Sequence, residues 1–227
     1  MSYKFSKWTI VPAAVLLLGT VALAQDPSSS GSSSNSGSSA SQGSSTPSTT
    51  PAHKPTIAQR KENQQDRIAQ GVKSGQLTAG ETANLETKEA AINGETRADR
   101  AANGGKLTQA EKQQVNRQQN QLSNQIYNDK HNTATQNYGN SEVGQRQRNQ
   151  QQRIAQGIKS GQLTAGETAK LENQQRGINQ QVKADRAANG GKLTTGEKQQ
   201  VNKEQNAASR NIYNKKHNAQ IQPKAKK

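Results

Sequence analysis

Histidines are the first side chains to consider for chemistry, because imidazole can serve as a metal ligand or an acid–base catalyst near neutral pH. His131 and His217 each stand four residues after a tyrosine, Tyr127 or Tyr213, so each pair shares one face of a helix. A lysine precedes each histidine. Lys and His are favoured at the negatively polarised end of a helix, and a lone histidine makes a poor metal site. We therefore expect helix C-termini here, with a ligand-binding or metal edge as the alternative.

The carboxylates at the most regular spacing belong to the motif Gly-x-Leu-Thr-x-x-Glu. It occurs four times, beginning at Gly75, Gly105, Gly161 and Gly191. Thr followed by Glu at the third position is the capping-box pattern, in which each side chain accepts a hydrogen bond from the other residue's backbone N–H. The glycine permits the left-handed conformation that often ends the preceding helix. The motif therefore predicts a helix, a tight turn with a buried leucine, and a second helix. The predicted capping residues are Thr78, Glu81, Thr108, Glu111, Thr164, Glu167, Thr194 and Glu197.

The same motif resembles the second half of an EF-hand calcium loop, with Gly at position six and Glu at position twelve. The first half does not fit, because too few oxygen ligands remain there for calcium. A degenerate calcium-responsive module therefore stays a minor alternative. In the first two copies, positions one, three and five would be Gln70, Val72 and Ser74, then Arg100, Ala102 and Gly104.

Catalytic patterns do not emerge from the rest of the sequence. The remaining histidine, His53, lies in a polar spacer, and no nucleophile stands beside a base. The Gly-Gly pair at 104–105 follows a predicted helix, whereas a phosphate-binding loop follows a strand. The chain has no cysteine, which excludes disulfides and thiolate metal sites. We predict no enzyme, no catalytic or metal site, and no cofactor.

The helices that carry these motifs form two copies of one pattern. Aligning Arg67 with Arg153 gives identity at roughly two-thirds of the positions, which indicates a tandem duplication. In the first copy, apolar residues at spacings of three, four and seven predict helices over about 57–72, 78–102 and 108–131. No stretch is rich in β-branched and aromatic residues, so strands are not expected. The sequence predicts an all-α fold of two tandem units of about three helices each.

The order of segments along the chain suggests an exported protein. Residues 1–24 combine two early lysines, an apolar run and Ala22-Leu23-Ala24, which together predict a signal peptide cleaved after Ala24. The apolar run is short for a membrane span, so no span is expected after cleavage, although a retained anchor is the alternative. Residues 25–56 are rich in Ser, Gly, Thr and Pro and are predicted to be a disordered spacer. Helical unit 1 (57–132), a linker (133–145), helical unit 2 (146–218) and a basic tail (219–227) follow. Secretion or a periplasmic location is expected.

The composition is strongly basic. The formal net charge is +15, with only 3% aromatic residues and 28% hydrophobic residues. A basic exported chain is attracted to anionic partners, such as a cell-envelope polymer or extracellular DNA, by weak and salt-sensitive binding. A solvated surface that keeps a Gln- and Asn-rich chain soluble is the alternative. The apolar stripes are narrow, so each unit is marginal alone, and a homo-oligomer could complete them.

Two function classes follow. The run from Arg67 through Gly-Gln-Leu-Thr to Ile126-Tyr127-Asn128-Asp129-Lys130-His131-Asn132 resembles a module of exported bacterial proteins that have no established activity. The first hypothesis is a non-catalytic interaction module of the cell envelope or extracellular space, which holds an anionic polymer or partner. The second is a hydrophilin-like desiccation protectant, suggested by 19 glycines and abundant Gln and Asn. The four caps argue against the second hypothesis, because caps matter only where helices form.

Overall fold

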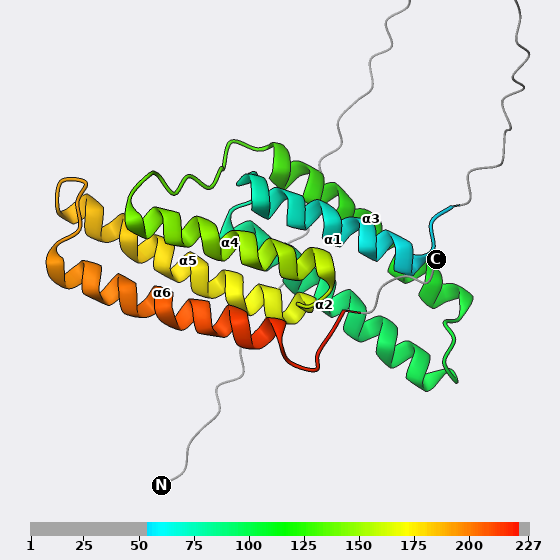
Figure 1. The fold of residues 1–227 in the computed structure, drawn as a ribbon. Coiled ribbons are helices and arrows are strands. Elements are labelled where there is room, and N and C mark those ends of the chain that lie inside the picture. Colours follow the sequence, from blue (N-terminus) through cyan, green and yellow to red (C-terminus); the bar gives the residue numbers. More distant parts are fainter. Residues whose placement is uncertain (1–53, 223–227) are drawn as a thin grey trace, which may run out of the picture. The chain divides into compact units, whose positions relative to one another are not determined.

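The computed structural model describes residues 54–222. The predicted signal peptide, nearly all of the spacer and the last five residues of the basic tail lie outside the described residues. Within residues 54–222 all regular secondary structure is helical, as predicted (Figure 1). None of these helices is long and apolar enough to cross a membrane. They are α1 (Ile57–Ser74), α2 (Ala79–Ala102), α3 (Gln109–His131), α4 (Glu142–Ser160), α5 (Ala165–Ala188) and α6 (Thr195–Lys216).

The helix bounds follow the capping signals closely, with one exception at α4. This helix begins at Glu142, so the linker predicted to run to residue 145 ends at Ser141. The Ser141 hydroxyl accepts a hydrogen bond from Gly144 N (3.3 Å) and caps the helix. Gly144 has a second role, because a Cβ there would lie 1.9 Å from the Tyr138 carbonyl oxygen. The linker therefore passes directly over the first turn of α4.

The turn between α1 and α2 shows why its motif has a fixed glycine and leucine. Gly75 has φ 75°, the left-handed conformation that ends α1. Leu77 donates its N–H to Gly71 O (3.1 Å), and its side chain is 2% exposed. It packs so closely on α1 that a Cβ on Gly71 would lie 2.6 Å from Leu77 Cδ1. The turn between α4 and α5 repeats this packing with Gly157 and Leu163.

The two sets of three helices pack against one another. The contacts between the sets are made by α2 with α5 and by α1 with α4. A single apolar cluster crosses the boundary and includes Ile68 and Leu85 from the first set with Ile154 and Leu171 from the second. A smaller cluster lies within the second set, where Ala208 replaces Leu122 of the first. Each set therefore completes its narrow apolar stripes with the other, and the possible homo-oligomer stays a prediction.

Glutamines fill much of the interior that apolar residues leave. Gln64 is 1% exposed and donates its Nε2 to Gln119 O (2.6 Å) and Ser123 Oγ (2.8 Å). Gln119 in turn donates to Ile57 O (2.9 Å), which ties α3 to the start of α1. The second set repeats these bonds with Gln150 and Gln205 at nearly the same lengths. Hydrogen-bonded amides can be buried without a large penalty, so a Gln-rich chain still forms a core.

Carboxyl groups are buried in the same interior. Glu86 of α2 and Glu172 of α5 occupy equivalent positions, are fully buried, and each accepts a hydrogen bond from a glutamine. One oxygen of each carboxyl has no hydrogen-bond partner among the described residues. Burial raises the pKa of Glu172 to about 8 and raises that of Glu86 well above its usual range. Protonation of these groups therefore favours the packed state.

Candidate anion-binding groove

The residues singled out as capping pairs all lie at helix starts. Thr78 Oγ1 accepts from Glu81 N (3.3 Å), and Glu81 Oε2 accepts from Thr78 N (2.8 Å). The other three pairs have the same reciprocal bonds. Glu111 shows the electrostatic consequence, because the Thr108 backbone N–H lowers its pKa. These residues position the helices and do not gather into one site.

The tyrosine–histidine pairs lie at the last turns of α3 and α6. The ring centroids of Tyr127 and His131 are 4.2 Å apart, and those of Tyr213 and His217 are also 4.2 Å apart. His131 Nδ1 lies 2.7 Å from Tyr127 O, so the imidazole bonds to a carbonyl of the final turn. In the described part of the chain no three His, Cys, Asp or Glu side chains are grouped to hold a metal ion.

The positions that would form the first half of an EF-hand calcium loop are helical. Gln70, Val72 and Ser74 lie within α1, and Arg100 and Ala102 lie within α2. A calcium loop needs these positions to turn their oxygens toward one centre, which a continuous helix does not do. The geometry of the repeated motif is that of a capped helix start.

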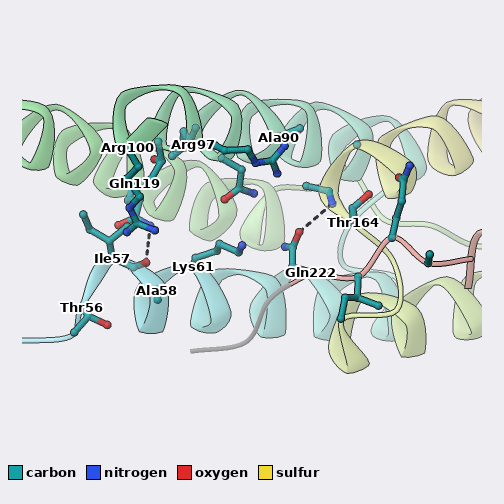
Figure 2. Close-up of a pocket in the computed structure, with 18 residues that line it drawn as sticks. Thr56, Ile57, Ala58, Lys61, Ala90, Arg97, Arg100, Gln119, Thr164 and Gln222 are labelled. Carbon is teal, nitrogen blue, oxygen red and sulfur yellow. Dashed lines mark hydrogen bonds between the residues drawn. The ribbon is translucent and has the colours of Figure 1, made fainter. Parts of the chain in front are cut away.

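A groove that no sequence motif predicted lies beside α1 and α2. It has a volume of ≈ 1080 Å³ and is closed at one end by the N-terminus of α5 and by residues 219–222 (Figure 2). We call it the first groove. Its lining contains three cations, no carboxylate and no aromatic ring. The residues are Thr56, Ile57, Ala58, Lys61, Ala90, Ile92, Asn93, Thr96, Arg97, Arg100, Gln119, Thr164, Ala165, Gly166, Ala219, Gln220, Ile221 and Gln222.

The three cations approach the groove from two helices. Lys61 extends from α1, and Arg97 and Arg100 extend from α2 on the opposite side (Figure 2). None of them forms an ion pair within the described residues, where the one pair present is Lys215 with Glu167 (3.8 Å). Burial and the two arginines lower the pKa of Lys61, although nearby Glu89 opposes them. The groove is therefore a region of positive electrostatic potential, which would attract an anion.

Glu89 lies behind the groove and offsets part of this charge. It is fully buried on α2, and Asn93, which lines the groove, donates to its Oε1 (3.3 Å). Burial raises the pKa of Glu89 to about 7, against the opposing effect of Lys61. Near neutral pH the carboxyl is thus only partly ionised, and the groove keeps a net positive charge.

The second helix set has an equivalent groove, which we call the second groove, and the linker of the same chain enters it. The linker residue Tyr138 lines both of the smaller cavities there, of ≈ 600 Å³ and ≈ 570 Å³. Burial raises the pKa of its phenol. The repeat alignment places Ala58 where the second groove has Gly144, so a Cβ blocks the path that the linker takes past α4. The residue equivalent to Tyr138 is Lys224, which carries the same charge as the first groove.

The lining chemistry has also diverged between the two grooves. Lys61 is replaced by Gln147, and Thr96 is replaced by Val182. Thr96 Oγ1 and Gln222 Nε2 are buried at the first groove without a hydrogen-bond partner among the described residues. The first groove therefore has a hydroxyl where the second has the apolar Val182, but the ≈ 600 Å³ cavity of the second set also has cations, Arg176, Lys183 and Arg186, and no carboxylate in its lining. The sequence signal that could have located the site is the set of positions where the two repeats differ, such as Lys61 against Gln147. The four copies of the capping motif are alike and do not indicate it.

No protein-family model matches the chain, and neither a curated protein nor a solved structure is similar enough to match it. Within residues 54–222 the structure thus defines an all-α body of two packed three-helix sets with a basic groove beside α1 and α2.

Proposed function

We propose that the protein is an exported, non-catalytic interaction module that holds an anionic polymer in the first groove, at the cell envelope or outside the cell. The observation that carries the proposal is the convergence of Lys61, Arg97 and Arg100 on one open cavity without a carboxylate in its lining. A negatively charged chain lying there would be attracted by all three cations and would exclude part of their water. The net charge of +15 favours encounter with such a polymer from a distance.

The absence of carboxylate and histidine from the lining also bears on the kind of activity. The groove offers cationic donors, hydroxyls and amides, which can bind a ligand. Burial lowers the pKa of Lys61, but the lining holds no carboxylate or histidine that could act with it as an acid–base pair, so these groups support the proposal of a binding groove.

The proposal is tested by binding of a polyanion at increasing salt. The variant Lys61→Gln/Arg97→Gln/Arg100→Gln is compared with Lys73→Gln/Arg117→Gln/Lys203→Gln, which removes the same charge at exposed positions outside the groove. The assay is fluorescence anisotropy with a labelled single-stranded oligonucleotide. The plot of log K against log salt has a negative slope, and we expect the groove variant to make it less steep by about 2. Equal effects of the two triple variants would show that only net charge matters and would refute a groove.

The protectant alternative is separated by circular dichroism of residues 54–227 in dilute buffer. The shared apolar cluster and the repeated Gln64 and Gln150 hydrogen bonds favour a cooperative helical melt in the absence of any partner. A coil spectrum that becomes helical only on drying would favour the protectant, because the helices would then be conditional on loss of water.

A further inference from the structure

The first groove has features that distinguish between classes of anionic polymer. Its lining lacks an aromatic ring, and stacking on aromatic side chains is the usual way in which proteins hold the bases of single-stranded nucleic acid. A phosphate backbone alone would use the three cations and leave much of the remaining lining without a role.

The remaining lining is rich in groups that pair with hydroxyls. Seven lining residues carry a hydroxyl or a primary amide and share the groove with the three cations. Each amide both donates and accepts, as sugar hydroxyls do, whereas ionised acid groups only accept. These residues are Thr56, Asn93, Thr96, Gln119, Thr164, Gln220 and Gln222.

Three of these side chains have a buried polar atom that is unpaired among the described residues, and one of these atoms is Gln119 Oε1. Thr96 Oγ1 and Gln222 Nε2 have no partner among the described residues, and leaving a buried polar group unpaired costs about 1–3 kcal/mol. Gln222 is held in place by its Oε1, which accepts from Ala165 N (3.4 Å) at the start of α5. A ligand that hydrogen-bonds at this wall would recover part of that cost. The second groove has Val182 in place of Thr96, and the unpaired buried atom in its lining is Asn179 Nδ2.

From this lining we infer that the ligand of the first groove is an acidic polysaccharide, whose hydroxyls meet Thr96 and the groove amides while its acid groups meet Lys61, Arg97 and Arg100. The inference rests on the proposed function and names the chemical class of the polymer. It also gives Thr96 a role in recognising a sugar hydroxyl by hydrogen bonding, which attraction between charges does not require.

The experiment compares three probes of equal length at one ionic strength: an oligogalacturonate, a neutral dextran oligomer and a single-stranded oligonucleotide with the same number of charges. The full chain is titrated by isothermal calorimetry. We expect the oligogalacturonate to bind about tenfold more tightly than the oligonucleotide, and the dextran oligomer to bind more weakly than either. Oligonucleotide binding as tight as that of the oligogalacturonate would overturn the inference and leave the proposed function standing.

The variant Thr96→Val separates hydrogen bonding from charge, and the second repeat already has valine at this position, so the fold should tolerate it. We expect it to weaken oligogalacturonate binding by about three- to tenfold, the range for one lost hydrogen bond, and to leave oligonucleotide binding unchanged. No change with either probe would refute the role of Thr96. If Lys61→Gln/Arg97→Gln/Arg100→Gln leaves the binding of both charged probes unchanged, the proposed function itself fails.

Discussion

Replacing the buried carboxyl of Glu172 by an amide should stabilise the protein, and increasingly so as the pH rises. Glu172 is fully buried on α5, and burial raises its pKa from 4.5 to about 8. For an acid whose pKa is higher in the folded state, folding is disfavoured above the unfolded value, and the penalty grows until the folded value is passed. Stability is therefore full below about pH 4.5 and is lost between about pH 4.5 and pH 8.

The size of the penalty follows from the shift. At 1.36 kcal/mol per pKa unit, ionisation of Glu172 costs about 3 kcal/mol at pH 7 and about 5 kcal/mol at pH 9. Glutamine keeps an acceptor for Gln151 Nε2, which lies 2.8 Å from Glu172 Oε2, but carries no charge. We thus expect Glu172→Gln to raise the free energy of unfolding by about 3 kcal/mol at pH 7 and to change it little at pH 4.5.

The assay is urea unfolding followed by circular dichroism at pH 4.5, 7 and 9. Glu62→Gln is the control, because it removes one negative charge from a half-buried side chain outside the core. The control should change the free energy of unfolding by less than about 1 kcal/mol at each pH. If Glu172→Gln and the wild-type chain show the same pH dependence, the buried carboxyl does not carry the penalty, and the packing of α2 on α5 would have to differ from that described.

Three further predictions concern the turns, the helix caps and the buried carboxyls where α2 packs on α5. Gly71→Ala should destabilise the fold by about 1–3 kcal/mol, because the new Cβ meets Leu77 Cδ1 at 2.6 Å, whereas Gly94→Ala in α2, with open space around it, should stabilise by about 0.5–1 kcal/mol. Thr78→Ala should cost about 1 kcal/mol in urea unfolding, since Glu81 N loses its acceptor; an unchanged midpoint would contradict the cap. Glu86→Gln combined with Glu172→Gln should give less than the sum of the single effects, because the charge on Glu172 raises the pKa of Glu86, and strict additivity would show that the two carboxyls do not interact.

The helices and their starts were predictable from the sequence because their causes are local. A Thr and a Glu three residues apart satisfy donors of the same turn, so four helix starts could be placed from single motifs. The start of α4 escaped this reasoning because Ser141 caps it without a partner Glu, and the spacing of polar residues there resembles a linker.

The interior and the groove could not be predicted in the same way, because they depend on contacts between distant residues. Gln64 and Gln150 are of a residue type that is usually exposed. Their side chains can be buried because they donate hydrogen bonds to Gln119 O and Gln205 O on another helix. Likewise, Lys61 and Arg97 are far apart in the sequence and meet only when α1 lies beside α2. The composition shows that the chain is basic, but it does not show which cations line the first groove.

The most direct measurement is the affinity of an oligogalacturonate for the wild-type chain, for Lys61→Gln/Arg97→Gln/Arg100→Gln and for Lys73→Gln/Arg117→Gln/Lys203→Gln, at one ionic strength by calorimetry. If the first groove is the binding site, the groove variant loses at least tenfold in affinity, and the surface variant of equal charge loses less than threefold. Equal losses in the two variants would contradict a groove and leave only a diffuse basic surface.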